Sequence, residues 1–186
     1  MKIDRSLNIV IPIEIDDSNT IWVHSRSISS DIFDKYYKPI AKAHAAMLMD
    51  NLGPFAAPKV ADKYLRDVCK DMDPSGAYWA EVQRGLLAEM YRLTNLILLG
   101  DKGWVTKPYE QAKKEKVLEA EDIAQIEAAL VFFTLGFSMY PVRERKAIID
   151  SAMSLWSART ESLNSTEFMS SLPTLTAVES SSEKAA

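Results

Sequence analysis

The side chains that most often carry catalysis or bind metals are sparse in this chain of 186 residues. It contains two histidines, His24 and His44, and one cysteine, Cys69. No His-Glu-x-x-His motif is present, and the two histidines do not stand at metal-ligand spacing. We therefore interpret both histidines as ordinary half-buried or surface residues. Cys69 falls on or beside an apolar helix face, which favours a small core residue over a nucleophile.

One stretch begins like a calcium-binding loop. Asp71-Met72-Asp73-Pro74-Ser75-Gly76 places oxygen ligands at positions one, three and five and glycine at position six. The pattern then fails, because Val82 stands at position twelve, where such a loop needs a bidentate glutamate. A helix break with acidic capping accounts for the same residues, so we expect no metal site.

Motifs for phosphate binding and acyl transfer are also missing, since neither a glycine-rich phosphate loop nor Gly-x-Ser-x-Gly occurs. Carboxylates are plentiful, and Glu119, Glu121 and Asp122 would be the first to test in an enzyme with an unfamiliar carboxylate site. Acids at the start of a helix are, however, what the helix dipole alone favours. We therefore expect no catalytic residue and no cofactor, and predict a protein that binds other proteins.

The charge balance argues against nucleic acid as a partner. Lys and Arg number 22 against 26 Asp and Glu, a net charge of −4, whereas duplex DNA requires a basic surface. The longest apolar run, Ala128 to Phe137, is about half of what a bilayer-spanning helix needs. The N-terminus lacks the apolar segment of a signal peptide. We expect a cytoplasmic protein without a membrane partner.

The first residues have the period of two that is typical of a strand, with branched apolar side chains on one face: Leu7, Ile9, Ile11, Ile13 and Ile15. Pro12 has no N–H, which suggests an edge strand or a bulge. A polar turn and a second strand, Thr20 to His24, complete a predicted hairpin of the longer-loop kind. A lone hairpin is marginal in water, so it must pack on the helices, on a partner or on a second copy of the chain.

Helical spacing follows from Ser29 or Ser30, with Pro39 expected to bend the first helix and Pro58 to begin the next. The clearest predicted amphipathic helix ends near Gly100 and carries one apolar stripe: Trp79, Val82, Leu86, Met90, Leu93 and Ile97. Further helices are expected at 108–116, at 119–137, after Pro141 and around 166–171, and 101–107 is expected to be a loop. The sequence thus predicts a mainly α protein with a small N-terminal β-hairpin (α+β). Its parts are a hairpin at 1–28, a single multi-helix body at 29–171 and a flexible Ser/Thr-rich tail at 172–186.

Two features point toward partners, and each has a plainer explanation. The hairpin combines an apolar face with an exposed edge, which can recruit another strand, or the face simply covers the helices. The loose tail carries a few apolar residues that fold onto a partner or belong to an inert end. The residues predicted to contact a partner are Ile9, Ile11, Ile13, Trp22, Val23, Leu172, Leu175 and Val178.

The layout of a strand pair, a helical body and a loose Ser/Thr tail resembles the tail assembly chaperones of long-tailed bacteriophages. The similar segments are Met1-Lys2-Ile3-Asp4-Arg5-Ser6-Leu7-Asn8-Ile9-Val10-Ile11-Pro12, the Gly103-Trp104 loop after Arg92-Leu93-Thr94-Asn95, and Ser162-Leu163-Asn164-Ser165-Thr166-Glu167-Phe168. The similarity covers most of the chain, but none of these segments carries a chemistry.

This resemblance implies a protein of the host cytoplasm that is absent from the mature virion. It would form oligomers, coat the helical tape measure protein and recruit tail tube subunits. It would also be the short form of two products, the longer one arising by a ribosomal frameshift near the end of the short reading frame. The alternative function is another structural or adaptor protein, such as a virion connector or a host-takeover factor.

Overall fold

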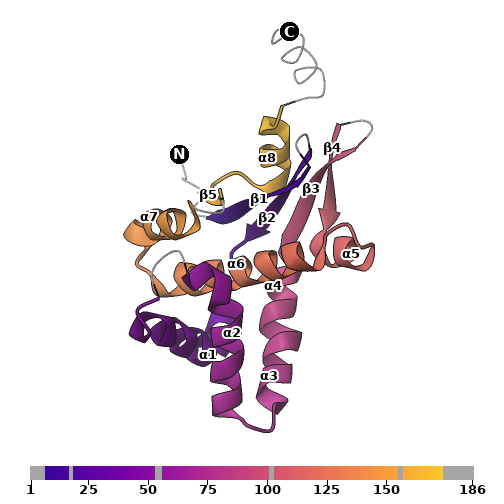
Figure 1. Cartoon of the computed structure of the whole chain (residues 1–186). Helices are drawn as coiled ribbons and strands as arrows, with labels where there is room; N and C mark the ends of the chain where they lie inside the picture. Colours follow the sequence, from indigo (N-terminus) through magenta and orange to yellow (C-terminus); the bar gives the residue numbers. More distant parts are fainter. Residues whose placement is uncertain (1–6, 17–18, 53–55, 101–102, 155–156, 174–186) are drawn as a thin grey trace.

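A single antiparallel sheet with helices on both faces organises the protein (Figure 1). The structure, a computed structural model, describes residues 7–16, 19–52, 56–100, 103–154 and 157–173. Within these residues the sheet has five strands in the order β4-β3-β2-β1-β5. The fold is therefore α+β, and the N-terminal hairpin is one part of a larger sheet instead of a small separate element.

The predicted hairpin is present as β1 (Asn8–Asp16) and β2 (Asn19–Arg26). Its register pairs Ile11 with Val23 and Pro12 with Trp22, and it shifts between Glu14 and Asp16. On its other edge β1 pairs with β5 only through Asn8, Ile9 and Val10. Pro12 therefore stands where no described strand pairs with that edge, the place that a residue without an N–H tolerates.

The helix predicted to reach Gly100 ends at Arg92, so the prediction is wrong for its last third. It consists of α3 (Ala77–Val82), the π-helical turn η1 (Gln83–Leu87) and α4 (Ala88–Arg92), and is followed by β3 (Thr94–Gly100). Leu96 and Ile97 are neighbours in sequence, and both are fully buried because they lie on opposite faces of the sheet.

The loop predicted at 101–107 is also wrong, since β4 (Gly103–Pro108) continues the hairpin that β3 begins. The Gly103-Trp104 pair therefore opens a strand. The short strand β5 (Arg159–Glu161) was not predicted at all. It is held from α7 (Val142–Met153) by the Asp150 carboxylate, which accepts hydrogen bonds from the Thr160 backbone N at 2.6 Å and hydroxyl at 2.7 Å.

The first two helices begin where the sequence predicted. In α1 (Ser30–Met49), Ser29 is the N-cap and accepts a hydrogen bond from the N of Ile32 at 3.4 Å. The bend expected from Pro39 is found one turn earlier, at Tyr36, whose backbone is not helical. Pro58 lies in the first turn of α2 (Ala57–Met72).

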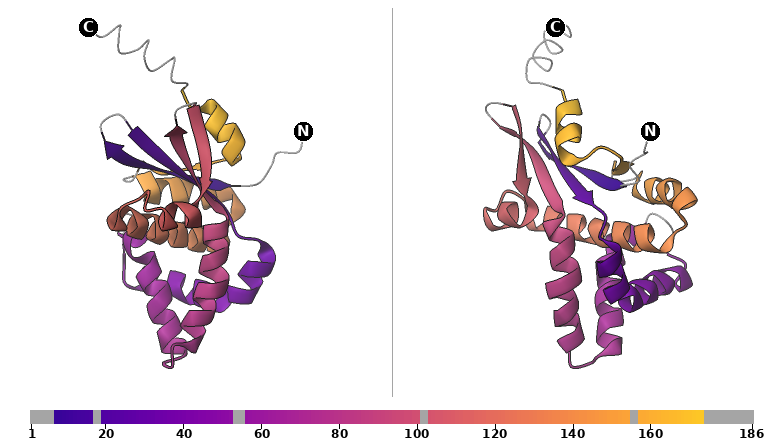
Figure 2. Two further views of the ribbon diagram at one scale, coloured as in Figure 1. Left: turned by 90° about the vertical axis from the view of Figure 1, so that its right-hand side faces the viewer. Right: turned by 180° about the vertical axis from the view of Figure 1, so that it is seen from behind.

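Helix α6 (Ala120–Met139) crosses the middle of the molecule, between the inner face of the sheet and the helices α1 and α2 (Figure 2). This double burial explains why its second half is apolar nearly all round, as predicted for a core helix. By length and composition alone α6 could span a membrane, yet 56% of its most apolar 18-residue stretch is buried inside the protein. The short helix α5 (Tyr109–Lys114) leads into it from β4.

The C-terminal segment returns to the sheet. After β5, the predicted helical turn is present as α8 (Ser165–Ser171), capped by Asn164, and it lies on the outer face of the sheet, opposite α6 (Figure 1). Leu172, the first residue of the predicted flexible tail, packs beside it. Residues 174–186 of that tail lie outside the described residues.

Candidate functional site

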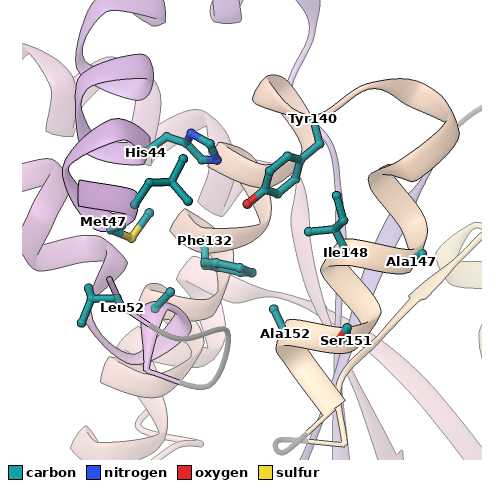
Figure 3. Close-up of a pocket in the computed structure, with 11 residues that line it drawn as sticks. His44, Met47, Leu52, Phe132, Tyr140, Ala147, Ile148, Ser151 and Ala152 are labelled. Atoms are coloured by element: carbon teal, nitrogen blue, oxygen red, sulfur yellow. The ribbon is translucent and has the colours of Figure 1, made fainter. Parts of the chain in front are cut away.

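An apolar groove opens between the end of α1, the end of α6 and α7 (Figure 3). Its volume is about 400 Å³, within the range of protein sites that enclose a small ligand or a few side chains. We call it the α1–α7 groove. Its lining residues come from four parts of the chain and are His44, Met47, Leu48, Leu52, Ala57, Phe132, Tyr140, Ala147, Ile148, Ser151 and Ala152.

Few polar groups face this groove, and they do not form a catalytic set. The rings of His44 and Tyr140 point toward each other in Figure 3, with centroids 5.0 Å apart and planes at 76°. Burial lowers the pKa of His44 and raises that of Tyr140, so both groups are neutral at neutral pH. The hydroxyl of Ser151 is the other polar group, and no hydrogen bond joins it to His44. The arrangement suits an apolar group better than a reaction.

The apolar surface continues from the groove along α1. Tyr37, His44 and Leu48 are spaced seven and four residues apart, so they share one side of the helix. Tyr37 is 50% exposed, Leu48 is 58% exposed, and the neighbouring Met49 is 80% exposed. The apolar residues of α1 therefore form two stripes. Ile40 and Met47 face the core, whereas Tyr37 faces solvent and His44 lies between, beside the groove.

The sequence placed the partner surface elsewhere, on the hairpin. Ile9, Ile11, Ile13 and Val23 lie on the inner face of the sheet and are at most 4% exposed, packed against the helices. This is the plainer explanation left open by the sequence, in which the apolar face covers the helical body. In this fold these four residues offer no surface to a partner.

Trp22 and Leu172 pack against one buried cluster on the outer face instead, although one comes from the hairpin and the other from the tail. The ring of Trp22 packs edge-on against Phe168 of α8, with centroids 5.6 Å apart. The other two predicted contact residues, Leu175 and Val178, lie outside the described residues. The hairpin and the tail, which the sequence analysis treated as two separate partner-binding features, thus contribute to one small cluster.

Polar contacts also fasten the C-terminal segment to this face. The carbonyl oxygen of Leu163 accepts hydrogen bonds from Asn8 Nδ2 and His24 Nε2, each at 2.9 Å. Trp104 Nε1 donates to the carbonyl oxygen of Pro173 at 2.8 Å. Burial lowers the pKa of His24, which is 1% exposed, so the ring is neutral and its single proton is on Nε2.

The remaining candidates have structural roles. The Asp73 carboxylate accepts hydrogen bonds from the Ser75 hydroxyl at 2.6 Å and from the backbone N of Tyr78 at 2.9 Å and of Ser75 at 3.0 Å. These hydrogen bonds lower its pKa, and they form at the predicted helix break. Glu119 and Asp122 form a capping box at the start of α6. Within the described residues, no three His, Cys, Asp or Glu side chains are grouped so that they could hold a metal ion.

Cys69 is fully buried, as predicted for a core residue, and burial raises the pKa of its thiol to about 11. The groove, by contrast, was missed by sequence reasoning, because it is assembled from four separated segments with no shared motif. The exposed pair Leu48-Met49 at the end of a helix was the one local signal for it. No protein-family model, curated protein or solved structure matches this chain at a significant level.

Proposed function

We propose that this chain is a non-catalytic tail assembly chaperone of a bacteriophage, which binds tape measure protein and helps to recruit tail tube subunits. The observation that carries the proposal is the α1–α7 groove, an apolar recess of about 400 Å³ with Leu48 exposed at its rim. Grooves of this kind receive the apolar face of a partner helix. The family resemblance implies that this partner is the long helical tape measure protein.

The exposed side chains beside the groove support a macromolecular ligand over a small molecule. Tyr37, Leu48 and Met49 extend the apolar surface along α1, beyond what a small ligand in the recess would cover. An exposed apolar surface next to a recess often marks a protein interaction site. The side chains of Leu48 and Met49 are flexible, and the unbranched side chain of Met49 in particular adapts to partners of varied shape.

The proposal places the protein in the host cytoplasm during tail assembly and outside the finished virion. It also includes self-association and a longer, frameshifted form. Both come from the family resemblance, and the nucleotide sequence offers a direct check on the second. If Glu183-Lys184 is encoded by an A-rich slippery run with an open overlapping frame beyond it, two forms are supported, and the lack of such a frame would count against them.

The decisive experiment is co-expression with the tape measure protein encoded by the same phage. We expect tape measure protein to be soluble with the wild-type chain and insoluble without it. Leu48→Asp should abolish this effect, because it puts a charge at the mouth of the groove. The matched control is Val105→Asp on β4, where the native side chain is 47% exposed and far from the groove along the sheet.

Equal insolubility of tape measure protein with and without the chain would overturn the proposal. Equal effects of Leu48→Asp and Val105→Asp would remove the groove from it. Recovery of the chain from purified phage particles in fixed amount would favour the alternative function, a virion connector, because an assembly chaperone leaves before the particle is complete.

A further inference from the structure

The outer face of the sheet is a second apolar surface, and residues 162–173 lie over it. We call these residues the C-terminal cover. Beneath it, Val10 and Ile97 are fully buried, and Trp22 and Trp104 are partly buried in the same cluster. This cluster is separate from the main core on the inner face. Removal of the cover would therefore expose apolar side chains without opening the core.

One side chain of the cover is fully buried, and three apolar side chains, those of Leu163, Met169 and Leu172, pack partly buried around it. The helix of the cover, α8, has seven residues, and Phe168 at 1% exposure is its fully buried side chain. The ring of Phe168 lies between Trp22 and His24, with centroids 5.6 Å and 6.0 Å away. Met169 packs at the margin, where its sulfur accepts a hydrogen bond from Thr106 at 3.5 Å. A short helix with one anchor opens more readily than the elements of a main core.

The polar groups under the cover are only half satisfied. One carbonyl oxygen, that of Leu163, serves both Asn8 and His24. The other polar atoms of these two side chains, the acceptors Asn8 Oδ1 and His24 Nδ1, have no hydrogen-bond partner within the described residues, although Asn8 is 2% and His24 1% exposed. Buried polar atoms without partners destabilise the closed arrangement, and opening would give both atoms to water.

We infer that the C-terminal cover is an autoinhibitory flap over a second protein-binding face, which accepts an amphipathic helical segment of a partner in place of α8. The chemistry of that segment follows from α8 itself. It needs one aromatic side chain that packs between Trp22 and His24, as Phe168 does. At its start it needs a backbone carbonyl oxygen that accepts hydrogen bonds from Asn8 and His24, as that of Leu163 does. This inference rests on the proposed function, because it takes tape measure protein as the partner that supplies such a helix.

Phe168→Ala tests the flap, because it removes the anchor and leaves the groove unchanged. We expect the variant to remain folded, hydrogen exchange of the α8 amides to quicken by about a hundredfold, and amides of α6 to keep their protection. The fluorescence of 1-anilinonaphthalene-8-sulfonate should rise with the variant, since the dye reports exposed apolar surface. In co-expression, more tape measure protein should be soluble with the variant than with the wild type.

A second variant tests whether tape measure protein binds the uncovered face of the sheet or whether the C-terminal cover is only loosened. Phe168→Ala combined with Trp104→Asp keeps the flap open but places a charge on the uncovered face. Solubility of tape measure protein should then fall back to the wild-type level or below it. Val105→Asp on the same strand is the control, and Phe168→Ala with Val105→Asp should behave like Phe168→Ala alone.

The outcomes separate this inference from the proposed function. If wild type keeps tape measure protein soluble but Phe168→Ala adds nothing, the flap is overturned and the chaperone proposal stands. If no form of the chain keeps tape measure protein soluble, the chaperone proposal fails. The flap is overturned independently if Phe168→Ala leaves α8 exchange and dye binding unchanged, or if it unfolds the whole protein at once.

Discussion

The hydroxyl of Tyr36 on α1 fills the space that a Cβ atom would occupy at Gly85 in η1. Tyr36 is the residue at which α1 bends, and Gly85 lies inside the π-helical turn that divides α3 from α4. Two departures from regular helix thus meet at one contact. The close approach explains why a glycine is found inside this helix, where it would otherwise be destabilising.

Replacement of Gly85 by alanine should therefore destabilise the protein. The added methyl group would overlap the buried Tyr36 ring, and one of the two helices must move. We expect the free energy of unfolding to fall by about 1–3 kcal/mol, measured by urea denaturation. Gly100→Ala is the control, since the nearest atom to a Cβ there is the Gly103 carbonyl oxygen at an ordinary 3.5 Å.

Tyr36→Phe should restore part of the stability lost in Gly85→Ala. It removes the hydroxyl that overlaps the new methyl group, and this hydroxyl has no hydrogen-bond partner within the described residues. The double-mutant cycle should give a coupling free energy well above zero. Additive effects of the two substitutions would show that the two side chains do not collide.

The stability of the C-terminal cover should decrease in acid. Burial lowers the pKa of His24, outweighing the hydrogen bond to Leu163 and the charge of Glu161, which raise it. The unfolded state then binds protons at higher pH than the folded state, so stability is complete above the ordinary histidine pKa of about 6.5 and is lost as pH falls below it. Hydrogen exchange of α8 amides between pH 7.5 and 5.5, corrected for the intrinsic rate, measures this loss.

The second histidine must be removed to isolate this effect. Burial also lowers the pKa of His44, which adds a loss of the same sign to any global measurement. In a His44→Phe background the pH dependence at α8 should persist, and in a His24→Phe background it should disappear. An unchanged profile in the His24 variant would assign the acid sensitivity to other groups.

The thiol of Cys69 should be unreactive in the folded protein. It is fully buried, and its pKa of about 11 leaves very little thiolate at pH 8. Ellman's reagent should label it at least a hundredfold more slowly in buffer than in urea. Fast labelling of the native protein would mean that α2 opens locally, which its position in the core argues against.

Filling the α1–α7 groove should block the proposed chaperone function without loss of fold. Ser151 lines the groove from α7 and is exposed, so Ser151→Trp can place a ring in the recess at little cost in stability. We expect an unfolding midpoint within a few degrees of wild type and loss of soluble tape measure protein. Arg66→Trp on the exposed side of α2 is the matched control. Retained solubility with Ser151→Trp would place the partner site elsewhere.

The sequence predicted those elements whose signals are local. The helix start at Ser29 or Ser30, the bend expected from Pro39 and the all-apolar half of α6 each depend on neighbouring residues. All three are present, with Ser29 as the cap and the bend one turn before Pro39, at Tyr36. The stripe from Trp79 to Ile97 led to the wrong prediction of a helix at Thr94–Gly100. The leucines and isoleucine of this segment fit the spacing of a helix and that of a strand. Pairing with β2 decided between them, and that partner lies some seventy residues away in sequence.

The partner surface was less predictable than the fold. An apolar strand face such as Ile9-Ile11-Ile13 has the same pattern whether helices or a partner cover it. Three residues of β5 are too few to show any period, and Thr160 is placed by the distant Asp150. The groove likewise depends on how α1, α6 and α7 converge.

The order of the strands also bears on the timing of folding during synthesis. Strands β1 to β4 and the helices from α1 to α7 leave the ribosome before β5 and α8, because these two elements are the last described ones in the chain. A nascent chain can therefore build the four strands β4-β3-β2-β1 and the inner core while Trp22 and Ile97 are still uncovered. Any partner that is synthesised nearby meets this bare face before the chain has closed it.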